Sequence, residues 1–182
     1  MTSVPAKTGD FELTLDELRV VAQFSVESAQ AVLPIFERAD QADSRPREAV
    51  QAAWAFVNGA ARTNLQRTSA LAAFRAAREV TGASAQHAAR AAGAAAAAAY
   101  LHPLARATQV GHVLGAAASA ARAAELDSSD HLDVGTRFIE RACQRATPGL
   151  IDVLRRYPPA PTGSNRVAQL MTMLDNALRS TR

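Results

Sequence analysis

Residues 83–100 read ASAQHAARAAGAAAAAAY, and this alanine-rich stretch decides the fold. Alanine is the strongest helix former because ordering its side chain costs no rotamer entropy. Gln86, His87 and Arg90 are the only strongly polar residues in the stretch, so a helix of this sequence would be poorly solvated on a surface. We therefore predict a central helix that other helices enclose, with Gly93 allowing a neighbouring backbone to approach closely.

Signals that start and stop helices recur on both sides of the central stretch. Thr14 and Glu17 form a capping box that starts a first helix, which Pro34 is expected to kink or interrupt. Ser84 is the expected N-cap of the central helix, and Pro103 ends that helix. The remaining predicted helices cover residues 44–58, 64–80, 104–126, 134–146, 150–156 and 164–180, with Leu65 and Leu71 expected to face inward.

These elements define an all-α fold. No window alternates apolar and polar residues as a half-buried strand would, and no period of about 20–50 residues recurs as in a solenoid. We therefore predict a compact multi-helix bundle around the alanine-rich helix, in a single domain over residues 1–182. Within it, residues 1–11 are expected to be a flexible lead-in, residues 157–163 a rigid proline-rich spacer, and residues 164–180 the C-terminal helix.

The charge balance is mildly basic. Lysine and arginine total 20 against 17 acidic residues, for a net charge of +3, and only 5% of the residues are aromatic. Nucleic-acid binding needs clustered basic residues with stacking aromatics, so it is a disfavoured alternative. The alanine stretch is too weakly apolar to span a membrane, and no apolar segment follows Lys7 as in a signal peptide. Because Cys143 is the only cysteine, we expect no internal disulfide and a cytoplasmic protein.

Two groups of charged residues are candidates for binding a partner. Asp43, Arg45 and Arg47 surround a proline where a helix begins, so two guanidinium groups and a carboxylate are available to grip a polar partner. His87 and Arg90 lie one turn apart near the start of the central helix and form a candidate anion contact. The alternative interpretations are ion pairs of the two loop arginines with neighbouring acids, and an ordinary solvated helix end.

A polar stripe marks the helix predicted at residues 104–126. We interpret it either as an ordinary exposed face or as a partner or ligand surface, with His112 as a candidate contact. No two histidines are spaced as a helical metal site requires, so we predict no metal, and no motif indicates a cofactor or a catalytic residue. The stripe recurs at three- and four-residue spacing and consists of Thr108, His112, Gly115, Ser119 and Arg122.

Four segments occur in order within residues 14–126 and carry a family resemblance. They are VLPIFE at 32–37, DSRPREAV at 43–50 with Trp54 following, AARAAG at 88–93 and GHVLGAA at 111–117. Together they resemble the putative immunity protein family of high-GC bacteria, whose members are often labelled exonuclease. The resemblance implies an α-helical protein that neutralises a cognate protein toxin by binding it, with no catalysis of its own. The exonuclease label gains no support, since metal-dependent nucleases need clustered carboxylates.

Two further interpretations stay open from the residues themselves. A helical small-ligand-binding protein, or an enzyme with a pocket beside the central helix, is the alternative to an immunity-type protein. A second copy of the chain is another candidate partner, because the spacer at 157–163 would let the leucines of the C-terminal helix reach across to it.

Overall fold

The computed structural model describes residues 11–181, and an all-α fold is confirmed for them. No strand occurs in this part of the chain, and two short 3₁₀ turns, η1 (Ala98–Tyr100) and η2 (Ala107–Gln109), flank the loop between α4 and α5. The helices are α1 (Leu15–Ala39), α2 (Arg45–Val57), α3 (Asn64–Glu79), α4 (Ala83–Ala97), α5 (Val110–Asp127), α6 (Leu132–Arg145), α7 (Pro148–Arg155) and α8 (Arg166–Ser180).

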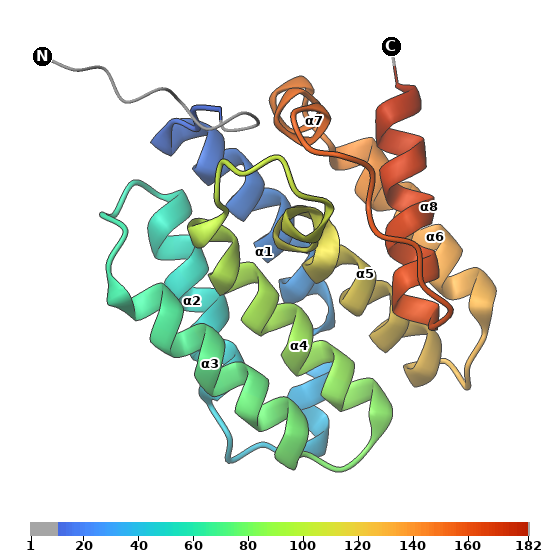
Figure 1. Cartoon of the computed structure of the whole chain (residues 1–182). Coiled ribbons are helices and arrows are strands. Elements are labelled where there is room, and N and C mark those ends of the chain that lie inside the picture. The colour runs from blue at the N-terminus through green and yellow to red at the C-terminus, as the bar shows by residue number, and fades with distance from the viewer. Residues whose placement is uncertain (1–10, 182) are drawn as a thin grey trace, which may run out of the picture.

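Helix α4, the predicted alanine-rich helix, lies at the centre of the bundle. It contacts α1, α2, α3 and α5, and Figure 1 shows it between α3 and α5. A Cβ atom on Gly93 would lie 2.8 Å from the ring of Phe74 and 3.1 Å from the carbonyl oxygen of Ala70, so α3 and α4 approach as closely as expected. The prediction of an enclosed central helix is confirmed by the fully buried side chains of Ala88, Ala89, Ala91, Ala92, Ala95 and Ala96.

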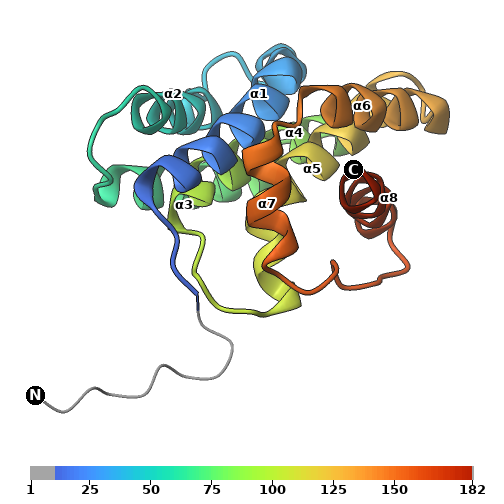
Figure 2. The ribbon, with the colours of Figure 1, turned by 90° about the horizontal axis from the view of Figure 1, so that it is seen from above.

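Two apolar clusters make up the core, and α1 and α5 contribute to both. One cluster combines the second half of α1 with α2, α3, α4 and one face of α5. The other combines the first half of α1 with the opposite face of α5 and with α6, α7 and α8. Figure 2 shows α1, α2 and α6 along one side of the molecule, with α8 toward the other. Helix α5 therefore joins the two halves of the bundle.

The C-terminal helix belongs to this core, which removes the basis for predicting a second copy of the chain as its partner. The three leucines expected to reach across, Leu170, Leu174 and Leu178, are at most 1% exposed within their own chain. The spacer before them is also held in place, because the amide of Ala160 donates to Asp175 Oδ2 at 2.9 Å. Apolar side chains already covered in the monomer leave nothing for a second copy to bury.

Of the two effects expected at Pro34, a kink or an interruption, the interruption does not occur, and the predicted start of a helix at residue 104 is wrong. Helix α1 continues through Pro34, which lies on the exposed side of the helix. Proline has no N–H group, so one carbonyl oxygen of the preceding turn lacks its helical donor, and water can hydrogen-bond to it instead. Leu33 and Phe36 stay buried. Helix α5 begins at Val110 rather than at residue 104. The preceding loop is held open by the hydroxyl of Tyr157, which donates to the carbonyl oxygen of His102 at 2.8 Å.

Local details differ at two other places. The N-cap position of α4 is Gly82, with φ of +100° and no side-chain cap, so Ser84 does not cap this helix. On α3, Leu65 and Leu71 are 53% and 52% exposed, because the small residues of that helix, rather than its leucines, face α4. Of the predicted lead-in, residues 1–10 lie outside the described residues, and the ring of Phe11 packs edge-on against Tyr157.

The close approach of helices around α4 predicts a steep cost for a larger side chain there. Ala95→Leu should lower the free energy of unfolding by about 1–3 kcal/mol, because a fully buried site in a close-packed core has no room for three more carbon atoms. Ala55→Leu, on the exposed face of α2, is the matched control and should change it by less than about 0.5 kcal/mol. Urea denaturation measures both, and equal effects of the two substitutions would contradict the packing described.

Candidate functional site

A groove runs along α5, between α3 and α4 on one side and the start of α8 on the other. It consists of two clefts of about 570 Å³ and 540 Å³ that share Arg90 and Ser119. Helix α4 contributes a stripe of His87, Arg90 and Ala94 at three- and four-residue spacing, which leaves one side of the enclosed helix open. We name this surface the basic groove after its basic side chains, the arginines Arg75, Arg78, Arg90, Arg122 and Arg166 and the imidazole of His87.

Three arginines of the basic groove have no internal partner. Arg75, Arg78 and Arg90 make no ion pair, hydrogen bond or ring contact with any described residue, whereas most other arginines are engaged. Arg38, for example, binds both carboxylate oxygens of Asp127 at 2.8 Å. Like charges gathered without counter-charges repel one another, so this part of the groove carries a positive potential that is not neutralised within the described chain.

Glu125 fixes the other two arginines of the groove. Its carboxylate is fully buried on α5 and accepts hydrogen bonds from Arg122 Nη1 at 2.9 Å and from Arg166 Nη2 at 2.6 Å. Arg122 also pairs with Asp130 at 2.5 Å. A Cβ atom on Gly135 of α6 would lie only 2.0 Å from Glu125 Oε1, so this glycine provides the space for the carboxylate. One acid thereby connects α5, α6 and α8.

The surroundings of His87 in the cleft disfavour a positive charge on its imidazole. Burial, followed by the positive charges of Arg90 and Arg122, lowers the pKa of His87 from 6.5 to about 4. The imidazole is therefore neutral near pH 7. Its Nδ1 atom is buried without a hydrogen-bond partner among the described residues.

The structure brings part of the predicted polar stripe into the same groove. Gly115, Ser119 and Arg122 line it, and Thr108 lines an adjoining cleft of about 450 Å³ beside the proline-rich spacer. His112, on the same helix, is half-buried and lines neither the groove nor this cleft, and its pKa is lowered by burial and then by the nearby charge of His102. His87, Arg90 and most of the stripe therefore share one surface, while their role in binding stays a prediction.

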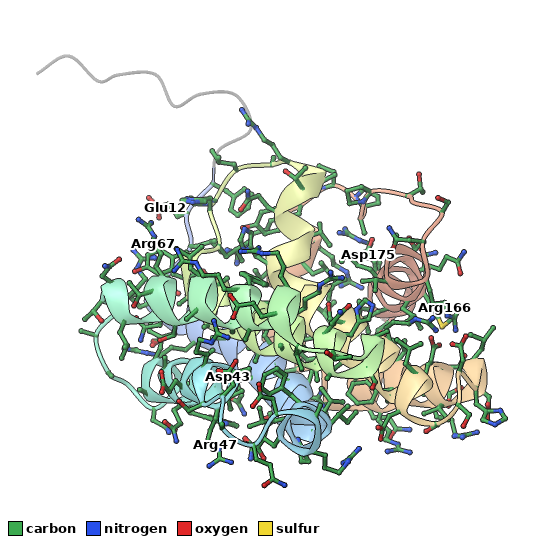
Figure 3. All side chains as sticks on the ribbon, turned by 90° about the horizontal axis from the view of Figure 1, so that it is seen from below. Glu12, Asp43, Arg47, Arg67, Arg166 and Asp175 are labelled. Carbon is green, nitrogen blue, oxygen red and sulfur yellow. The ribbon has the colours of Figure 1, made fainter. Side chains whose placement is uncertain are left out.

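The loop at Asp43, Arg45 and Arg47 does not join this surface. Arg45 binds Asp43 at 2.6 Å and Glu79 at 2.5 Å, and Arg47 binds Glu37 at 2.7 Å, so both guanidinium groups have internal partners. The Arg45 guanidinium holds the pKa of the Asp43 carboxyl below its usual value. Figure 3 shows Asp43 and Arg47 well away from Arg166. This geometry corresponds to the internal ion-pair interpretation of the loop, and a contact with a partner there stays a prediction.

Sequence reasoning missed Arg75, Arg78, Arg166 and Glu125 as parts of the site. On the sequence alone, Arg75 has an acid four residues later, Glu79, with which an ordinary helical ion pair would form. In the structure Glu79 binds Arg45 instead, which leaves Arg75 without a partner. For Glu125 the sequence offered two signals, an acid within an alanine-rich helix and Arg122 three residues before it, whereas its second arginine, Arg166, comes from the distant helix α8.

A comparison with protein families matches residues 12–148 to the family described as Imm-5 like putative immunity protein. The chain belongs to this family. The match extends beyond the segments at 14–126 that carried the resemblance, and it includes α1 to α6 but not α8. Searches of curated proteins and of solved structures returned no match.

Two other properties of this Imm-5 like chain bear on the kind of site it carries. Within residues 11–181, no three histidine, cysteine, aspartate or glutamate side chains gather as a metal site would require. None of the described helices combines the length and apolarity needed to cross a membrane.

The position of Glu125 predicts that Gly135→Ala destabilises the protein although alanine favours helix. The new Cβ atom would displace a buried carboxylate from its two arginines, at a cost of about 2 kcal/mol in the free energy of unfolding. Gly115→Ala is the matched control, because its Cβ atom would meet only the methyl group of Met171 at 3.9 Å and should stabilise the fold by about 0.5–1 kcal/mol. Thermal denaturation of both variants checks the prediction, which is wrong if Gly135→Ala also raises the melting temperature.

Proposed function

We propose that this Imm-5 like protein neutralises a cognate protein toxin by binding it through the basic groove, without catalysis. The family supports the class of function, because its description is that of an immunity protein. The single observation that carries the choice of surface is the set of three arginines in one groove, Arg75, Arg78 and Arg90, that have no partner among residues 11–181. The proposal places the protein in the cytoplasm, where its one cysteine would stay reduced.

The chemistry of the groove indicates what kind of toxin surface would fit. Gathering like charges costs free energy in the unbound protein, and an acidic partner would remove that cost on binding. Each guanidinium can bind a carboxylate through two parallel hydrogen bonds, and arginine is common among the residues that dominate binding energy. Beside them, Leu71 is 52% exposed and Phe74 is half-buried, so an apolar contact is also available. The proposed partner surface is acidic, with an apolar side chain next to its carboxylates.

The cleft at His87 supports one second candidate function, the binding of a small anionic ligand. Its volume of about 570 Å³ lies in the range of ligand pockets, about 300–1,000 Å³. Such pockets are mostly apolar, however, whereas this cleft is lined largely by charged and polar side chains. Nucleic-acid binding has less support, because Phe74 is the only aromatic side chain in the described lining and bases stack on aromatic rings.

Reversing one charge tests the proposal. The candidate toxin is a protein encoded beside this chain, co-expressed with it and scored for survival of the host cells and for co-purification. Arg90→Glu should weaken binding at least about tenfold and abolish protection, since a hydrogen bond to a charged group contributes about 1.5–3 kcal/mol.

Arg141→Glu is the matched control for this experiment. Arg141 lies on α6, outside the groove, and like Arg90 it has no partner within the described part of the chain, so the charge change is the same. This variant should protect and co-purify as the unsubstituted protein does. Full protection by Arg90→Glu, or equal losses in both variants, would contradict the proposed surface.

A further inference from the structure

The end of the basic groove next to α8 is lined by hydrogen-bond donors. Six polar side chains border this cleft, and no described carboxylate lines it. Glu125 and Asp130, which pair with two of the arginines, do not belong to its lining. The six side chains are those of His87, Arg90, Ser119, Arg122, Asn165 and Arg166.

Several of these donor groups make no hydrogen bond with the described residues. Arg90 and the hydroxyl of Ser119 have no hydrogen-bond partner among residues 11–181. The Oδ1 atom of Asn165 accepts from the backbone amide of Ala168 at 2.9 Å, which caps α8 and leaves the side-chain NH₂ group to donate. The capped helix also turns its positive N-terminal end toward the cleft, which favours a negative charge there.

The tautomer of His87 adds a further donor. An N–H group buried without an acceptor costs more than a buried lone pair, so the neutral ring should not carry its proton on the unpartnered Nδ1 atom. The proton then lies on Nε2, the ring nitrogen that remains accessible in a residue lining the cleft. A neutral His87 can therefore donate to an anion without adding another positive charge beside Arg90 and Arg122.

The geometry of the cleft is fixed in advance of binding. The buried carboxylate of Glu125 holds Arg122 and Arg166 in position, and it leaves other N–H groups of both guanidiniums to donate. Side chains that are already ordered lose little conformational entropy when a ligand arrives. Ordered donors that surround a cleft without an acceptor are the features of an oxyanion-binding site.

We infer that the cleft between His87 and Arg166 is a pocket for one oxyanion group, which the carboxylate of an Asp or Glu side chain on the partner supplies. The assignment of the oxyanion to a carboxylate of the toxin rests on the proposed function, whereas the existence of the oxyanion pocket does not. Arg75, Arg78 and the apolar pair Leu71 and Phe74 then bind the rest of the partner surface, and the pocket holds its central acidic residue.

Nuclear magnetic resonance of the full chain, without any toxin, tests the pocket. Two probes are titrated near pH 6.5, inorganic phosphate and a hexaglutamate peptide, each against sodium chloride at the same ionic strength. Both probes should produce saturable shifts at His87, Ser119 and Asn165 that the chloride control does not produce. The pKa of His87 should also rise from about 4 by roughly one unit or more, because a bound anion offsets the positive charges of Arg90 and Arg122.

Substitutions show whether the shifts come from this pocket. Arg90→Gln should raise the dissociation constant of phosphate about tenfold, and Ser119→Ala should raise it by a smaller factor. Arg141→Glu, outside the groove, should leave the dissociation constant unchanged. Shifts with both probes support a pocket that accepts carboxylates, and shifts with phosphate alone overturn the carboxylate assignment. Shifts that equal those with chloride, or a dissociation constant that Arg90→Gln leaves unchanged, overturn the pocket.

The result of this titration can be distinguished from the result of the toxin experiment that tests the proposed function. If phosphate and the peptide bind at His87 but no toxin is neutralised, the pocket stands and the immunity assignment fails. If a toxin is neutralised in a manner that depends on Arg90 but neither probe binds, the immunity assignment stands and the pocket is overturned.

Discussion

Helix α4 presents methyl groups, and almost nothing larger, to the four helices that surround it. Small side chains allow helix axes to approach closely, so α1, α2, α3 and α5 enclose α4 without leaving room for charged residues between them. The basic residues of α4 therefore lie on the side that its neighbours leave open. His87 and Arg90 lie on that side, and the basic groove forms there because α3 and α5 carry arginines beside it.

A second constraint closes the other side of the groove. The buried Glu125 binds Arg122 of its own helix and Arg166 of α8, and Gly135 of α6 gives it space. A buried carboxylate is costly unless hydrogen bonds satisfy it, so these contacts fix where α8 begins relative to α5. The family match ends at residue 148, so the α3–α5 side of the groove lies within the matched segment and the α8 side lies outside it.

How well the sequence predicted each feature of the structure depends on how far apart in the sequence the interacting residues lie. The central helix, its enclosure and the all-α class depend on local helix propensity and on composition, and these predictions were confirmed. Whether Pro34 would interrupt α1 could not be decided from the sequence, because the burial of Leu33 and Phe36 on both sides of the proline depends on tertiary packing.

The candidate site was predicted only in part for the same reason. Spacing along α4 and α5 was sufficient to single out His87, Arg90 and the stripe, and His87, Arg90 and three of the five stripe residues do line one groove. The ion pair of Arg45 with Glu79 joins residues distant in sequence, and it both engages the predicted loop and leaves Arg75 without its helical partner. Which arginines stay unpaired is decided by such long-range competition, which periodicity does not show.

The central claim is that the basic groove is the surface through which this Imm-5 like protein binds an acidic protein partner. A crystal structure of the complex with a co-purified toxin tests it most directly. The account predicts carboxylates of the toxin within hydrogen-bonding distance of Arg75, Arg78 and Arg90. A complex in which the groove stays open to solvent, with the toxin seated on the loop at Asp43–Arg47 or on α6 and α7, would contradict it.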